Sequence, residues 1–355
     1  MNTADPKSSP IKKIPLILLT GFLGSGKTTL LRQMLTMPGW RDTLVLINEL
    51  GAVGLDHHLL WGASDQVHLM ENGCLCCSVR DDLAGVLEDL FWRRLQRQIP
   101  AYDRVVIETT GLADPGPVIA TLLSNPLVAQ RYLLDGVLCT VDALHAEQQL
   151  TQHPESLAQA MAADILLVTK TDLAHEAHSA ELQRRLEHMN PLALVQRSQE
   201  ATLAPTLLAD LSVRSASRLR NVPSYSRLSA PRKPQAGMLL GRPSDAFQHA
   251  AVQTRCLHFD RPWDRAALDQ ALDATLVQYG AALLRIKGLL DIVDEPGPLV
   301  IQTVQQTRFP IERLALWPEG QRDSFVVFIS IGLGDCDVGH LFRTHTHPSI
   351  KTLAR

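Results

Sequence analysis

The chain has 355 residues, 45% of them hydrophobic and 20% charged, a composition that excludes disorder throughout and can bury the cores of two domains. Its 34 Lys and Arg residues against 37 Asp and Glu residues give a formal net charge of −3, which provides no electrostatic reason to expect nucleic acid or a membrane as a partner. Six Cys residues are too few for a disulfide scaffold, and no apolar run fits a signal peptide or a membrane span of about 20 residues. We therefore expect a cytoplasmic protein with reduced thiols.

Short apolar runs alternate with stretches of helical periodicity through the first half of the chain. Alternation of this kind predicts an α/β fold, in which helices cover both faces of a mainly parallel sheet. Buried strands are predicted at residues 14–19, 43–47, 104–107, 136–141 and 165–168, and helices at residues 28–35, 81–95, 118–123, 157–162 and 180–188.

The composition changes after residue 211. Residues 212–244 hold seven basic residues among Ser and Pro and no acidic one, which is typical of an exposed linker, although the charge also suits an acidic partner. Beyond it strands outnumber helices, which predicts a smaller α+β domain with strands at residues 254–259, 283–290, 299–304 and 325–331 and a helix at residues 264–276. The expected organisation is a polar tail at 1–13, a first domain at 14–211, the linker at 212–247 and a second domain at 248–355.

The sequence GFLGSGKT at residues 21–28 matches G-x-x-x-x-G-K-[ST], the pattern of loops that bind nucleotide phosphates. It lies between a predicted strand and a predicted helix, as the mechanism needs, because the helix adds its positive end to the N–H groups of the loop. Lys27 is expected to reach the β- and γ-phosphates and Thr28 to ligate Mg²⁺, so that the sequence predicts a P-loop rather than a turn without function. The nucleotide-binding residues expected here are Gly21, Gly24, Ser25, Gly26, Lys27, Thr28 and Thr29.

A P-loop needs a second acid near the metal, and Glu108 follows the predicted strand 104–107. Its carboxylate is expected to act on Mg²⁺ or on the attacking water, unless it is only a surface acid at a strand end. The backbone N–H of Gly111 is expected to contact the γ-phosphate. Lys27, Glu108 and Glu49, which follows the second strand, form the expected catalytic set.

Residues 169–172 read TKTD, close to the guanine motif N-K-x-D. The carboxylate of Asp172 can accept from guanine N1–H and N2–H₂, a pair of donors that adenine lacks, and the stem of Lys170 can lie over the base. Thr169 stands where Asn is usual. GTP is therefore predicted in preference to ATP.

Three of the six cysteines, Cys74, Cys76 and Cys77, fall within four positions. Thiolates bind Zn²⁺ and other soft or borderline divalent ions, so a metal-binding loop is predicted, with a buried apolar cluster as the alternative. A helix starting near residues 78–81 would favour the thiolates of Cys76 and Cys77. Further ligand candidates follow the second strand, although a His is more often an ordinary surface residue: Glu49, Asp56, His57 and His58.

These motifs together resemble the CobW-type metallochaperone GTPases, relatives of the nickel-insertion GTPases HypB and UreG. The likeness rests on the P-loop, the C-x-C-C loop, residues 108–115 (ETTGLADP) and residues 169–172, and it extends to Val141-Asp142 and to RIKG at residues 285–288. It implies metal-dependent GTP hydrolysis that delivers zinc, or cobalt, to a client metalloprotein. The chain departs from the family pattern at Ala52, where a second Glu is frequent, at Thr169, and in lacking a His-rich stretch between the domains.

The leading hypothesis is thus a slow GTPase switch that binds zinc or cobalt with an affinity set by the nucleotide. A P-loop phosphotransferase or cofactor-biosynthesis enzyme with structural cysteines is the alternative, and a metal-buffering or interaction module with a vestigial nucleotide site is a third hypothesis. The sequence leaves a homodimer open. It also leaves open whether the C-terminal residues Asp335, Cys336, Asp337, His340, His345 and His347 bind metal or form a polar tail.

Overall fold

The structure, a computed structural model, describes residues 13–48, 68–69, 75–79, 82–198, 252–317, 322, 324–333 and 341–342, with the backbone alone at 48, 68–69 and 75–79. The expected tail, except for Lys13, and the expected linker at 212–247 lie outside the described residues.

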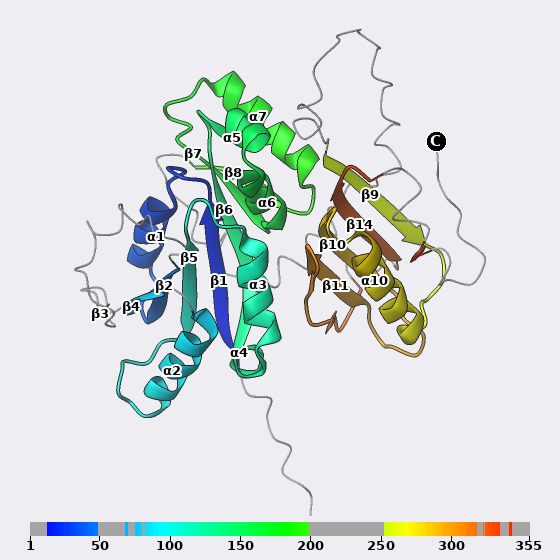
Figure 1. The fold of residues 1–355 in the computed structure, drawn as a ribbon, viewed down its shortest axis with the longest axis horizontal. Helices are drawn as coiled ribbons and strands as arrows, with labels where there is room; N and C mark the ends of the chain where they lie inside the picture. The colour runs from blue at the N-terminus through cyan, green and yellow to red at the C-terminus, as the bar shows by residue number, and fades with distance from the viewer. Residues whose placement is uncertain are drawn as a thin grey trace, which may run out of the picture.

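The first half of the chain forms an eight-stranded sheet in the order β3-β4-β2-β5-β1-β6-β7-β8 (Figure 1). Every neighbouring pair is parallel except the antiparallel pair β3 and β4. The predicted parallel sheet is confirmed, while β3, β4 and β8 were not predicted: β3 and β8 are short, and β4 has too few apolar residues to give a strand signal. The strands are β1 (Ile14–Gly21), β2 (Thr43–Asn48), β3 (His68–Leu69), β4 (Leu75–Val79), β5 (Arg104–Thr109), β6 (Tyr132–Asp142), β7 (Ile165–Thr169) and β8 (Leu194–Arg197).

Both faces of this sheet are buried, because successive side chains of a strand point to opposite faces. In β1, Ile17 and Leu19 pack with α1 (Lys27–Thr36) on one face. Leu16 and Leu18 pack on the other face with α2 (Leu83–Leu95) and α3 (Pro115–Ser124). The remaining helices of this half are α4 (Pro126–Arg131), α5 (Ala146–Gln152), α6 (Pro154–Ala162) and α7 (Glu176–Met189).

The second half forms an antiparallel sheet in the order β12-β11-β10-β14-β9, with β13 paired to β11. One face packs on α10 (Arg265–Tyr279). The other face packs through Leu289 and Val327 on side chains of α6 and α7, so the two domains share one hydrophobic cluster. The predicted α+β architecture is confirmed. The strands are β9 (Val252–Phe259), β10 (Leu283–Leu290), β11 (Leu299–Val304), β12 (Thr307–Arg308), β13 (Glu312–Arg313) and β14 (Ser324–Ile331).

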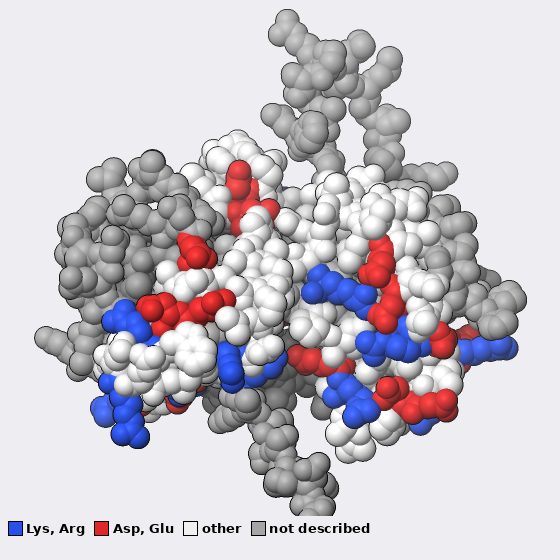
Figure 2. All heavy atoms as spheres, turned by 60° about the horizontal axis from the view of Figure 1, so that its bottom comes forward, with Lys and Arg blue, Asp and Glu red and all other residues white. Residues whose placement is uncertain are grey.

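The described surface carries charge of both signs. On the face drawn in Figure 2, Lys and Arg side chains are interspersed with Asp and Glu side chains over both halves of the view. Within the described parts of the chain, no helix is both long enough and apolar enough to cross a bilayer.

Candidate functional site

The loop between β1 and α1 has the backbone that its glycines permit. Gly21, Gly24 and Gly26 have φ values of 140°, 70° and 94°, in the region that side-chain-bearing residues rarely adopt. A Cβ on Gly21 would lie 2.3 Å from Oγ1 of Thr140 on β6. Gly26 is the N-cap of α1, so the N–H groups of the first turn open toward the loop. The predicted sequence of strand, loop and helix is present here.

Lys27 and Thr28, the first residues of α1, lie against the loop and against β5. Lys27 is buried, and its Nζ donates to the carbonyl oxygens of Gly21 at 2.8 Å and Phe22 at 3.1 Å. The Thr28 hydroxyl donates to Oε1 of Glu108 at 2.7 Å, and Glu108 is only 1% exposed on β5. An ammonium beside the loop suits phosphate, and a hydroxyl beside a carboxylate supplies the hard oxygen ligands that Mg²⁺ prefers.

The motif at residues 169–172 lies at the end of β7, beside the P-loop. The Thr169 hydroxyl donates to the carbonyl of Ser25 at 2.7 Å, which ties this strand to the loop despite the shorter side chain. Lys170 has φ 55° and its Nζ lies 2.7 Å from Oδ2 of Asp142. Burial raises the pKa of Asp142, but its hydrogen bonds to Lys170, Leu144 N–H and His145 outweigh this and hold the pKa below its usual value. Asp172 lies exposed in the following turn.

The segment after β5 runs along the P-loop. A Cβ on Gly111 would stand 2.6 Å from the backbone nitrogen of Leu23, so the two backbones are in close contact and only glycine fits. Gln159 of α6 donates from Nε2 to the carbonyl oxygens of Gly111 at 3.1 Å and Ala113 at 2.9 Å. At the start of the same helix, the ring of His153 lies 4.6 Å from that of Phe22.

The predicted thiol site is described only in part. The backbone at Cys76 and Cys77 belongs to β4, so the expectation of a loop there is wrong: residues 75–79 are hydrogen-bonded to β2. The expected helix start at 78–81 is also wrong at residues 78–79, since α2 begins at Leu83 with Asp82 as its N-cap. Within the described ranges, no three side chains of His, Cys, Asp or Glu lie close enough together to hold a metal ion. Outside those ranges lie Cys74, Glu49, Asp56, His57, His58, Asp335, Cys336, Asp337, His340, His345 and His347.

Of the remaining cysteines, Cys139 lies within the buried strand β6. It is 1% exposed, and burial raises the pKa of its thiol to about 12, as is usual for a cysteine that packs in a hydrophobic core. Sequence reasoning missed Gln159, Thr140 and Asp142 as partners of the nucleotide segments. The position of Asp142 directly after a predicted strand was a signal that could have identified it, whereas a Gln inside a helix gives no such signal.

Comparison with known proteins agrees with this geometry. The family described as CobW/HypB/UreG, nucleotide-binding domain, matches residues 15–197, and the family described as cobalamin synthesis protein cobW C-terminal domain matches residues 252–344. The zinc chaperone YjiA of Escherichia coli K12 is 35% identical over 93% of this chain and 98% of its own length. The zinc chaperone CobW of a Sinorhizobium species is 28% identical over 92% of this chain and 94% of its own.

A solved structure extends the likeness to three dimensions. The crystal structure of Zn(II)-bound YjiA GTPase from E. coli matches with a TM-score of 0.70 at 32% identity and covers 95% of this chain and all of that one. The nucleotide-binding match spans β1 to β8, and the second match spans β9 to β14. The chain therefore belongs to the CobW family of P-loop GTPases.

Proposed function

We propose that this chain is a metallochaperone that hydrolyses GTP, binds Zn²⁺ at Cys74, Cys76 and Cys77, and delivers it to a client metalloprotein under control of the bound nucleotide. Co²⁺ is the alternative cargo. The thiols need a reducing compartment, so the proposed place of action is the cytoplasm.

The nucleotide half of the proposal is supported by three contacts. Lys27 lies under the loop carbonyls, where it can turn to the β- and γ-phosphates. Thr28 and Glu108 are the proposed holders of Mg²⁺, which would neutralise charge on the phosphates and orient them. Asp172 and Lys170 are proposed to bind guanine, and Gly111 N–H the γ-phosphate. Glu49 is proposed to assist hydrolysis.

The metal half is supported by the strand order, which is the observation that carries the proposal. β4 pairs with β2 and β2 pairs with β5, so that Cys77 and Ile107 both face Leu46 in the register. Because neighbouring strands lie about 5 Å apart, the backbones of Cys77 and Ile107 are about 10 Å apart, and Ile107 directly precedes Glu108. A cargo site this close to the phosphate-binding edge can respond to nucleotide state. The names of the relatives, zinc chaperone YjiA and zinc chaperone CobW, favour zinc.

The experiment is a metal titration in two nucleotide states. Zn²⁺ and Co²⁺ are added to the apo-protein with Mg²⁺ and either GDP or a non-hydrolysable GTP analogue. We expect affinities that differ at least tenfold between the states and a thiolate-to-cobalt charge-transfer band. In Cys76→Ser/Cys77→Ser that band and tight binding should disappear while GTP still binds. Cys256→Ser is the matched control, because Cys256 is a partly exposed thiol 3.4 Å from His258 on the distant strand β9.

Each outcome separates a part of the proposal. A charge-transfer band that persists in the double variant would refute the cysteine site. Equal affinities in the two nucleotide states would refute the switch and leave a metal-binding GTPase. Turnover that requires an added phosphate acceptor would instead favour the phosphotransferase reading.

A further inference from the structure

The segment from Thr110 to Asp114 is held from two sides. It follows Glu108 on β5 and lies against the P-loop at Leu23. Because the segment is in contact with the phosphate-binding loop, its position is expected to depend on whether a γ-phosphate is bound there. Besides the P-loop, side chains from α6 and from the C-terminal domain contact it. Both contacts come from glutamine carboxamides.

The first carboxamide is that of Gln159. It is fully buried, and its Nε2 donates to two carbonyls of the segment, Gly111 and Ala113. Its Oε1 is buried without a hydrogen-bond partner in the described parts of the chain. Both hydrogen bonds that Nε2 donates go to the segment, so this buried carboxamide fixes the position of two of its carbonyl groups.

The second carboxamide is that of Gln305, in the turn between β11 and β12. Its Nε2 donates to Oδ2 of Asp114 at 2.7 Å, while Oδ1 of the same carboxylate caps α3 at the N–H of Gly116. A Cβ on Gly116 would lie 2.1 Å from Oε1 of Gln305, so a glycine is needed for this approach. The contact joins residues 191 positions apart and crosses between the two domains.

Gln305 adopts an unfavourable backbone conformation. Its φ is 51°, in the left-handed region where Gly or Asn is ordinary and Gln is not. Its N–H donates to the carbonyl of Leu284, which fixes the turn to β10. A residue keeps an unfavourable backbone conformation where the surrounding structure holds it in place, and here the side chain of Gln305 is held by Asp114.

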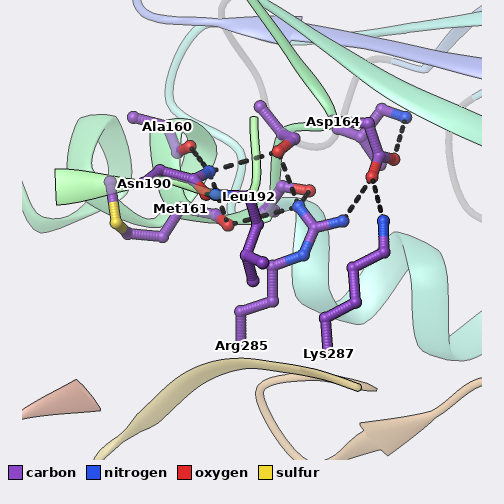
Figure 3. A network of polar contacts seen from close by, with 10 residues as sticks. Ala160, Met161, Asp164, Asn190, Leu192, Arg285 and Lys287 are labelled. Atoms are coloured by element: carbon purple, nitrogen blue, oxygen red, sulfur yellow. Dashed lines mark hydrogen bonds and ion pairs between the residues drawn. The ribbon is translucent and has the colours of Figure 1, made fainter. Parts of the chain in front are cut away.

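The C-terminal domain also holds α6 itself. Arg285 of β10, 0% exposed, donates to the carbonyl oxygens of Ala162 and Ala163 at 2.6 Å each, at the end of α6 (Figure 3). Asn190 donates to carbonyls of the same turn. The helix that carries Gln159 is therefore fixed at its far end by the second domain.

We propose that Gln305 and Gln159 are positioning residues for GTP hydrolysis, so that the C-terminal domain completes the hydrolytic site through the segment 110–114. In this reaction a water oxygen bonds to the γ-phosphorus, the bond to the β–γ bridging oxygen breaks, and GDP, phosphate and a proton result. Their proposed role is indirect, without contact to the attacking water or the phosphate. They hold the segment whose Gly111 N–H is proposed to bind the γ-phosphate. This inference rests on the proposed GTPase site but not on the cargo-metal site.

The test is Gln305→Gly in the full chain, with Mg²⁺·GTP and no cargo metal. Glycine adopts φ 51° without strain, which offsets the loss of the hydrogen bond in part, so the variant should stay folded with a thermal stability close to that of the parent protein. Loss of one hydrogen bond to a carboxylate predicts a fall in kcat of about tenfold. KM for GTP should change less than twofold, because the phosphate-binding loop is intact. Gln306→Ala is the matched control: Gln306 is the next residue of the turn, exposed, and packs on Gly280 instead of the segment.

Amide hydrogen exchange gives the second readout. In the parent protein, exchange at the turn 305–306 should differ between the GDP state and the GTP-analogue state, and in Gln305→Gly this difference should vanish. A kcat within twofold of the parent, or equal losses in Gln305→Gly and Gln306→Ala, would overturn the proposal. Either result would leave the metal titrations untouched, whereas a parent protein without GTPase activity would overturn the proposed function itself.

Discussion

The charged cluster between the domains gives the sharpest prediction about stability. Asp164, 4% exposed, forms an ion pair with Arg285, lies 3.4 Å from Nζ of Lys287, and accepts from the N–H of Val137 at 3.0 Å. Both cationic side chains, which point toward Asp164 in Figure 3, are buried. Asp164→Asn keeps the shape and removes the negative charge, which leaves two positive groups away from water. We expect the free energy of unfolding to fall by about 3–5 kcal/mol.

The same cluster predicts a pH dependence. Burial raises the pKa of Asp164, but Arg285 and Lys287 outweigh it and lower the pKa from 3.8 to about 2. A carboxyl with a lowered pKa in the folded state stabilises the protein above the unfolded pKa, and that stabilisation is lost as the pH falls through the folded pKa. A shift of this size corresponds to roughly 2–3 kcal/mol at neutral pH, and a large part of this contribution is lost by pH 3. The Asn variant lacks this contribution.

Urea unfolding followed by circular dichroism at pH 7, 4 and 3 measures both effects. Asp89→Asn is the matched control, because its ion pair with Arg93 at 3.6 Å is exposed and its loss should change stability by less than about 0.5 kcal/mol. A loss below about 1 kcal/mol in Asp164→Asn at pH 7 would refute the reasoning, since breaking a buried pair is expected to be far more destabilising. The reasoning would also be refuted if the difference in free energy of unfolding between parent and variant were as large at pH 3 as at pH 7.

Three further predictions concern the nucleotide site and the domain organisation. Lys27→Ala should lower kcat for GTP hydrolysis by about 10²–10³-fold. A purified variant whose kcat lies within twofold of that of the parent would contradict the role of Lys27. Asp172→Asn should weaken the preference for GTP over other purine nucleotides in competition binding; an unchanged preference would remove Asp172 from the base site. Brief trypsin treatment should cut first within residues 212–247, and the two fragments should stay associated on size exclusion, because Arg285 and the shared cluster join them. Early cuts spread through residues 82–198 would contradict this organisation.

The fold was predictable where one period dominates the sequence. β10 and β11 have the predicted bounds, and the strands of the first sheet extend the predicted runs by a few residues. Apolar residues buried on both faces give this signal directly. β4 was missed because LCCSV has one apolar residue at each end and its pairing with β2 depends on distant residues. α4 and α5 were missed because they are only 6 and 7 residues long, too short for periodicity.

The site was predictable where a local motif carries it. The P-loop glycines, Lys27, Thr28 and Glu108 lie together as the spacing of strand and helix requires. Gln159 and Gln305 could not be found this way, because a glutamine has no motif and its partner is set by the packing of α6 and of the second sheet. The sequence does not predict the left-handed backbone conformation at Gln305 either, since Gln does not favour it.

The two links between the domains differ in strength, and this difference matters for a switch. Arg285 is fully buried and joins two carbonyls and a carboxylate, so its loss is as unfavourable as that of a buried ion pair, about 3–5 kcal/mol. Gln305 makes one hydrogen bond to the part-buried Asp114, a contact of about 1.5–3 kcal/mol. Rearrangement of segment 110–114 can therefore break the second link while the first remains. In the proposed switch, Arg285 would stay in place while the contact at Gln305 changes with the nucleotide. A link built from directed hydrogen bonds fixes one arrangement of the two domains, whereas an apolar contact alone would let them slide, so a rearrangement of segment 110–114 would reach the C-terminal domain as a defined displacement.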